Sequence, residues 1–168
     1  MKNEPQKVVH PFEPVWDKDC EILILGSLPS VKSREVQFYY GHPKNRFWQV
    51  LASVYGATTP VTTEEKKAFL LGNHIALWDV VASCEISASS DSSIKNVAVN
   101  DICPLIEKSK ISRIFTNGAT ADRLYRKYIF PQTGIEPVKL PSTSPANAAW
   151  RTESLVEEWF SAIKEKGI

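Results

Sequence analysis

The chain has 168 residues, of which 43% are hydrophobic and 23% charged, proportions that are ordinary for one globular domain with a single core. The formal net charge of +1 does not by itself indicate nucleic-acid binding, although a local basic patch can bind phosphates on a nearly neutral chain. Three cysteines without a CxxC pair and three widely spaced histidines argue against a disulfide framework or a metal site. We therefore expect reduced thiols, a cytoplasmic location and no metal or cofactor, and no segment resembles a secretory signal or a membrane span.

The predicted elements alternate between strands and helices. Residues 1–20 contain three prolines and are expected to form an extended arm. Helix starts are indicated by a capping asparagine at Asn45, a capping box formed by Thr62 and Glu65, and a second capping asparagine at Asn100. The predicted strands are 21–26, 74–81, 111–117 and 134–140, and the predicted helices are 45–56, 62–72, 100–106, 119–128 and 152–164.

This alternation predicts the fold class. It indicates an α/β protein with a parallel sheet and helices on both faces, and residues 1–168 are expected to form one domain. Ligands bind such sheets beyond the carboxyl ends of the strands, so we expect the functional site in the loops that follow the strands.

The segment that follows the first strand is GSLPSVKSREVQFYYGHPKNRFW, residues 26–48. It is long for a connection, and long loops in compact domains are often functional. It matches neither a P-loop nor a dinucleotide fingerprint. Aromatic residues at 38–40, which could hold a base, alternate with the basic residues Lys32, Arg34, Lys44 and Arg46. The alternative is that the aromatic rings belong to the core and the charges form a solvated rim.

A second loop, LPSTSPANAAW, covers residues 140–150 and follows the last predicted strand. Its hydroxyl groups and prolines are suited to a stiff segment that lies against phosphates and brings a small wedge to a duplex. The alternative is an ordinary turn before the final helix.

Together the two loops resemble the uracil-DNA glycosylase superfamily, nearest to its deoxyinosine (hypoxanthine) branch and related to the mismatch-specific uracil/thymine glycosylases. The resemblance is carried, in order, by ILILGSLPS, YYGHPKNRFW, LWDVV, IFTNG and LPSTSPANA. It implies a three-layer α/β/α sandwich around a central four-stranded parallel sheet. It also implies a monofunctional DNA N-glycosylase that removes hypoxanthine or uracil and starts base-excision repair.

The resemblance assigns a water-positioning or base-recognition role to Asn45. In mismatch-specific relatives an asparagine of the first motif positions the attacking water, but Leu28 stands at that position here and cannot form a hydrogen bond. The deoxyinosine branch resembles this arrangement, with its essential asparagine in the HPKN segment. The alternative is that Asn45 only caps its helix. Asp79 is a second candidate, as a general base.

Other roles follow from the same resemblance. Tyr40 matches the aromatic residue that stacks on the extruded base, and core packing is its alternative. His42 either binds the base or braces its turn, whereas Trp48 is expected in the core. Backbone groups facing the base and sugar are expected at Gly26, Ser27 and Leu28. Contacts to DNA are expected at Lys44, Arg46, Ser142, Thr143, Ser144, Pro145, Ala146 and Asn147, of which the last three form the tip that enters the duplex.

The expected partners are DNA that contains deaminated bases and the enzymes that process the abasic product, and the chain is expected to be a monomer. Two other functions remain open. One is a mismatch-specific uracil/thymine glycosylase, and the other is a DNA- or nucleotide-binding α/β module without catalytic activity, for which Leu28 is the best argument. A small-molecule hydrolase is less compatible with the sequence, which lacks a GxSxG motif.

Overall fold

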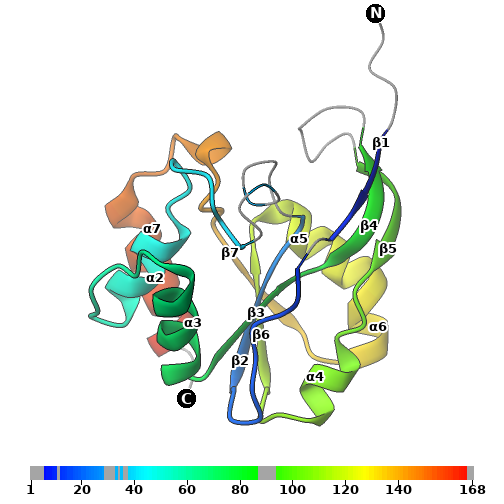
Figure 1. The fold of residues 1–168 in the computed structure, drawn as a ribbon, viewed down its shortest axis with the longest axis horizontal. Coiled ribbons are helices and arrows are strands. Elements are labelled where there is room, and N and C mark those ends of the chain that lie inside the picture. The colour runs from blue at the N-terminus through cyan, green and yellow to red at the C-terminus, as the bar shows by residue number, and fades with distance from the viewer. Residues whose placement is uncertain are drawn as a thin grey trace, which may run out of the picture.

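The computed structural model describes residues 6–10, 12–28, 33, 35, 38–86 and 94–165. Its centre is a four-stranded sheet in the order β3-β2-β6-β7, in which every neighbouring pair is parallel (Figure 1). The strands are β2 (Ile22–Gly26), β3 (Ile75–Asp79), β6 (Arg113–Asn117) and β7 (Pro137–Leu140). The predicted four-stranded parallel sheet is confirmed.

Helices cover both faces of this sheet (Figure 1). Residues of α2 (Phe47–Val54), α3 (Thr63–Gly72) and α7 (Thr152–Phe160) share one hydrophobic cluster with the sheet. Residues of α4 (Cys103–Glu107) and α5 (Ala119–Leu124) share a second cluster with the opposite face. The arrangement is the expected three-layer α/β/α sandwich.

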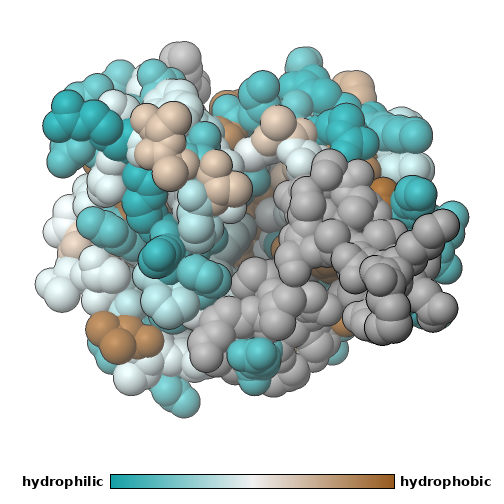
Figure 2. Space-filling model, turned by 90° about the horizontal axis from the view of Figure 1, so that it is seen from above, coloured by the Kyte–Doolittle hydropathy of each residue, from teal (hydrophilic) through white to brown (hydrophobic). Residues whose placement is uncertain are grey.

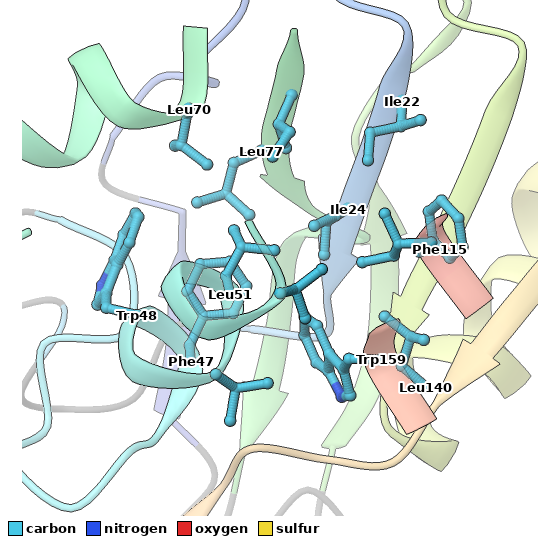
Figure 3. Packing of buried hydrophobic residues seen from close by; sticks show 14 of the residues in the cluster. Ile22, Ile24, Phe47, Trp48, Leu51, Leu70, Leu77, Phe115, Leu140 and Trp159 are labelled. Atoms are coloured by element: carbon cyan, nitrogen blue, oxygen red, sulfur yellow. The ribbon is translucent and has the colours of Figure 1, made fainter. Parts of the chain in front are cut away.

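Strand β2 shows why the sheet is buried on both sides. All five of its residues are buried. Because side chains alternate along a strand, Ile22 and Ile24 enter the cluster of α2, α3 and α7, whereas Leu23 and Leu25 enter the other one. Figure 3 shows Ile24 facing the side chains of α2 and α7. An uninterrupted apolar run is therefore what this central position requires.

Local sequence signals set several helix ends. Thr62 caps α3 and forms the predicted capping box with Glu65, whose backbone N–H lies 3.1 Å from the Thr62 hydroxyl oxygen. The helix predicted after Asn45 is α2, and it ends just before Gly56, whose φ of +63° is readily adopted only by glycine. Trp48 is buried, as predicted.

A second, antiparallel sheet was not predicted. It consists of β1 (Gln6–Val9), β4 (Val81–Ile86) and β5 (Ile94–Val99), in the order β1-β4-β5. The prediction of one strand over 74–81 is wrong, because the chain leaves the central sheet after Asp79 and continues in the second sheet from Val81. The apolar character of the sequence continues through both strands. The two are therefore distinguished only by the strands with which they pair, which are distant in sequence.

Three other predictions differ in detail. Asn100 does not cap α4, because its side chain donates instead to the carbonyl oxygens of Asp79 and Val81. The helix predicted over 119–128 consists of α5, a π-helical turn (Tyr125–Ile129) and α6 (Phe130–Thr133). Gly134 has a φ of +69° and ends α6, which is why β7 begins only at Pro137. The last predicted helix consists of α7 and a π-helical turn (Ser161–Glu165).

Within the described ranges, no helix combines the length and the apolar character needed to span a membrane.

Replacing Ile24 by alanine should lower the free energy of unfolding by about 2–4 kcal/mol, because it empties part of a fully buried site. Urea unfolding followed by circular dichroism measures this change. Val61→Ala is the matched control: Val61 is 75% exposed, and we expect a change within about 0.5 kcal/mol. Equal losses in the two variants would contradict the placement of Ile24 in the core.

Candidate active site

Two loops far apart in sequence meet above the carboxyl edge of the central sheet. One follows β2 and leads to α2, and the other follows β7 and leads to α7. In Figure 1 the cyan segment before α2 and the orange segment before α7 lie together at the top of the molecule. Figure 2 looks onto this side, where the described surface is mostly hydrophilic with a few small hydrophobic areas. This is the position where parallel sheets bind ligands.

Arg46 joins the two loops. Its guanidinium Nη1 donates to the Trp150 carbonyl oxygen at 2.7 Å, and Nη2 donates to the Asn147 carbonyl oxygen at 3.2 Å. The Arg46 backbone N–H also donates to the Thr143 carbonyl oxygen. Arg46, which was predicted to contact DNA, thus holds the second loop in place through hydrogen bonds to the loop backbone. Its charge lies next to the predicted DNA surface, but its guanidinium group already donates to carbonyl oxygens of the protein.

Thr143 anchors the second loop to the sheet. Its side chain is buried, its Oγ1 accepts from Asn117 Nδ2 at 3.0 Å, and its backbone N–H donates to Asn117 Oδ1 at 3.1 Å. The Thr143 side chain has no exposed surface for DNA, so its place is structural. Gly118, which follows Asn117 at the end of β6, has a φ of +99°, and a Cβ there would lie 3.1 Å from the Ser142 Cβ. The positive φ favours glycine at this position, and the close approach of the two segments adds to that preference.

Internal hydrogen bonds stiffen the tip of the second loop. The Ser142 Oγ accepts from the Ser144 N–H, and the Ser144 Oγ accepts from the Ala146 N–H, both at 3.1 Å. Asn147 Nδ2 donates to the Ser142 carbonyl oxygen. A short 3-10 turn, η3 (Pro145–Asn147), forms the tip. Since both serine oxygens act as acceptors, their hydroxyl hydrogens remain suitable donors to phosphate oxygens.

Tyr40 places an aromatic platform in the first loop. Its ring stacks on Phe47 with centroids 4.0 Å apart and an interplanar angle of 17°. Its φ of +54° is uncommon for a tyrosine and turns the chain sharply before Gly41. The hydroxyl oxygen is enclosed, and none of the described groups has hydrogen-bond geometry to it. Burial, reinforced by the charge of Asp79, raises the pKa of the Tyr40 phenol, and the nearby Asn117 side chain partly opposes this effect.

Gly26, at the end of β2, lies against two side-chain oxygens. A Cβ added there would be 2.4 Å from Asp79 Oδ1 and 2.7 Å from the Tyr40 hydroxyl oxygen, so only glycine fits. The other carboxylate oxygen of Asp79, Oδ2, lies 2.8 Å from His10 Nε2, and both side chains are only 4% exposed. This buried pair comes from the N-terminal segment and the end of β3.

Asn45 and His42 shape the turn between Tyr40 and α2. The Asn45 Oδ1 accepts from the Phe47 N–H at 2.9 Å, so the side chain does cap the start of α2. Its Nδ2 end remains for a further role. His42 Nδ1 accepts from the Lys44 N–H at 3.0 Å, which leaves Nε2 to carry the hydrogen of a neutral ring. His42 therefore braces its turn and still presents a donor, while Lys44 is exposed.

The first motif, which here includes Gly26, Ser27 and Leu28, is held by the residues that follow β3. The carbonyl oxygens of Gly26 and Ser27 accept from the N–H groups of Val80 and Val81, so each of these two carbonyls already has one backbone partner. Leu28 is half-buried and packs against the hydrophobic cluster of α4 and α5. Pro29 and the basic residues Lys32 and Arg34 lie outside the described residues.

Sequence reasoning missed two side chains of this site. His10 stood in an arm without a predicted partner, and nothing local to it indicates Asp79. Asn117 ends a predicted strand at the ligand-binding edge, a signal that could have identified it. Among the described residues, no three His, Cys, Asp or Glu side chains lie in an arrangement that could hold a metal ion.

Comparison with known proteins agrees with this architecture. The profile of the Uracil DNA glycosylase superfamily matches residues 14–164. The chain is 37% identical to the hypoxanthine DNA glycosylase of Methanosarcina acetivorans over 155 residues, covering 91% of this chain and 96% of the relative. It is 33% identical, with the same coverage, to the hypoxanthine DNA glycosylase of Methanosarcina barkeri.

A solved structure is similar throughout its length. The solution NMR structure of a candidate uracil DNA glycosylase from Methanosarcina acetivorans superposes with a TM-score of 0.77 at 34% sequence identity. The match covers 97% of this chain and 96% of that one. By fold, by the meeting of the two loops and by sequence, the chain belongs to the uracil DNA glycosylase superfamily.

Proposed function

We propose that this chain is a DNA glycosylase that hydrolyses the N-glycosidic bond of a deaminated base in DNA, with hypoxanthine as the preferred base. The observation that carries the proposal is the meeting of the Tyr40 platform and the serine-rich loop above the carboxyl edge of the sheet, in a member of this superfamily. The two relatives named hypoxanthine DNA glycosylase support the choice of base.

The reaction needs a water molecule, a held sugar and a base that leaves with the electron pair of the broken bond. Water adds its oxygen to the sugar carbon C1′ and loses a proton, the bond from C1′ to the base nitrogen breaks, and the base takes up a proton. The products are an abasic site and the free base. Hypoxanthine and uracil leave more easily than adenine and cytosine, because their carbonyl oxygens share the developing negative charge.

Asn45 is the residue we assign to the water or the base. Its Oδ1 is engaged by the Phe47 N–H, so the Nδ2 amide is the end directed to this role. An amide can orient a water molecule but is a poor proton acceptor, and we therefore expect slow turnover that depends on a good leaving group. Tyr40 would stack on the extruded base through the ring face opposite Phe47.

The second loop supplies the proposed DNA surface. Ser142 and Ser144 would donate to phosphates, exposed Lys44 would add charge, and the Pro145–Asn147 tip would face the duplex. Trp150, 37% exposed, lies at the end of this loop and widens the contact area. Because the tip residues are small, extrusion would depend on the weakness of a mispair. A monomeric state, a cytoplasmic location and transfer of the abasic product to a downstream enzyme belong to the same proposal.

Asn45→Ser should lower the single-turnover rate of hypoxanthine release by about 100-fold or more, because serine lacks the carboxamide. Serine still caps a helix, so its free energy of unfolding should stay within about 0.5 kcal/mol of the wild type, whereas Asn45→Ala should lose about 1 kcal/mol as well. Rates from inosine-containing duplexes and urea unfolding measure the two effects. If the activity of Asn45→Ser remains near that of the wild type, the residue is a helix cap alone.

The wild-type protein should release hypoxanthine from inosine-containing duplexes about tenfold or more faster than uracil from G·U pairs, a difference of about 1.4 kcal/mol in activation free energy. Alkaline cleavage of the abasic products measures both rates on otherwise identical duplexes. Faster uracil release would indicate a mismatch-specific uracil glycosylase, and an uncut but bound inosine duplex would indicate a binding module.

Arg46→Lys should weaken binding to inosine-containing DNA by about tenfold, because lysine keeps the charge but cannot make the forked contacts that hold the second loop. The salt dependence of binding should not change. The control is Lys44→Gln, which should reduce the slope of log affinity against log salt by about one and leave the loop intact. If Arg46→Lys binds inosine-containing DNA as tightly as the wild type, Arg46 is not acting as a clamp between the loops.

A further inference from the structure

The N-terminal segment brings His10 to the carboxyl end of β3. Strand β1 pairs with β4, and the His10 N–H then donates to the Ala82 carbonyl oxygen at 2.7 Å. The ring reaches Asp79, with Nε2 2.8 Å from Oδ2, while Nδ1 lies 2.8 Å from the Phe12 carbonyl oxygen. A contact between residues 69 positions apart, with both side chains 4% exposed, is a specific tertiary interaction.

The two nitrogens of His10 face two oxygens. The Phe12 carbonyl can only accept, so Nδ1 carries a hydrogen. The contact of Nε2 with Asp79 then needs one further hydrogen, either on the ring or on the carboxyl group. In both forms His10 forms a hydrogen bond with the buried carboxyl group of Asp79, and the loss of His10 would leave the carboxyl group without this partner.

The remaining carboxylate oxygen of Asp79 faces the platform of the proposed base site. Asp79 Oδ1 and the enclosed Tyr40 hydroxyl both lie within 2.7 Å of the position that a Cβ on Gly26 would take. The two oxygens therefore share the space that a side chain at position 26 would fill. A shift of Asp79 would change both the space and the charge beside the Tyr40 hydroxyl, at the end of the ring that stacks on Phe47.

Tyr39, the neighbour of Tyr40, is held by the same N-terminal segment. The Tyr39 hydroxyl donates to the Glu13 carbonyl oxygen at 2.8 Å, and its ring packs edge-on against Phe12 with centroids 4.5 Å apart. Two adjacent residues of the first loop are therefore fixed from one side, Tyr39 by the segment directly and Tyr40 through Asp79.

We propose that His10 is a positioning residue for base excision, which holds Asp79 in place so that Asp79 fixes the Tyr40 ring on which the extruded base would stack. The role of the ring rests on the proposed function above. The positioning of Tyr40 by His10 and Asp79 concerns only the protein without bound DNA. No contact of His10 or Asp79 with the substrate is required.

Two substitutions of His10 separate its two contacts. In His10→Gln the side-chain amide can replace Nε2 and keep a hydrogen bond to Asp79, whereas in His10→Asn it replaces Nδ1 and keeps only the contact with Phe12. We expect His10→Asn to lower the single-turnover rate of hypoxanthine release by about tenfold or more, and His10→Gln to stay within about threefold of the wild type. The opposite order would show that His10 only fastens the N-terminal segment, and would overturn the proposal.

Binding measurements distinguish positioning from general loss of structure. Affinity for a duplex with a tetrahydrofuran abasic analogue, which has no base to stack, should stay within about twofold in both variants, while His10→Asn should bind the inosine duplex more weakly. Equal weakening for both duplexes would overturn the proposal. In the double variant with Asp79→Asn, His10→Asn should add little to the loss caused by Asp79→Asn alone, and additive losses would show that His10 does not act through Asp79.

Hydrogen–deuterium exchange tests the positioning without any activity. In His10→Asn, peptides spanning residues 38–47 should exchange faster than in His10→Gln, and the central strands should not change. Faster exchange confined to residues 6–15 would overturn the proposal. If the wild type released no base, the proposed function would fail, whereas this exchange experiment would still decide whether His10 positions the Tyr40 loop.

Discussion

The arrangement of this molecule depends on strand β2, which is buried on both faces and ends at a glycine. Its alternating side chains join two hydrophobic clusters, so the strand cannot move without disturbing both helix layers. Its last residue, Gly26, has no side chain, and the space is occupied by the ends of Asp79 and Tyr40. A fully buried central strand therefore sets the reference position for the proposed base site.

Hydrogen bonds hold the described parts of the two loops above this edge. Asn117 fixes the start of the second loop through Thr143, and Arg46 fixes its end through the Asn147 and Trp150 carbonyl oxygens. Both anchors are attached to regular elements, β6 and the start of α2. A site assembled in this way is preorganised, because the bonds that anchor the loops are made within the protein.

Two polar side chains of the first loop each use one group to hold the local structure and keep another group for a further contact. Asn45 caps α2 with its oxygen and keeps its amide, and His42 accepts a backbone N–H and keeps a donor. A structural role of these residues is therefore compatible with the functional role proposed for them. One face of each group stabilises the loop, and the same bond orients the other face.

The sequence by itself determined the three-layer class, the four central strands and the loops that carry the site, because these features depend on local patterns: apolar runs, capping residues and glycine at strand and helix ends. It also determined family membership, through motifs whose order along the chain is specific. Only the tertiary structure decided where the second sheet begins, that Thr143 is buried, that Arg46 joins the loops and that His10 meets Asp79. Each of these depends on partners distant in sequence, and a hydrogen bond between residues 69 positions apart leaves no periodic or local signal in the chain.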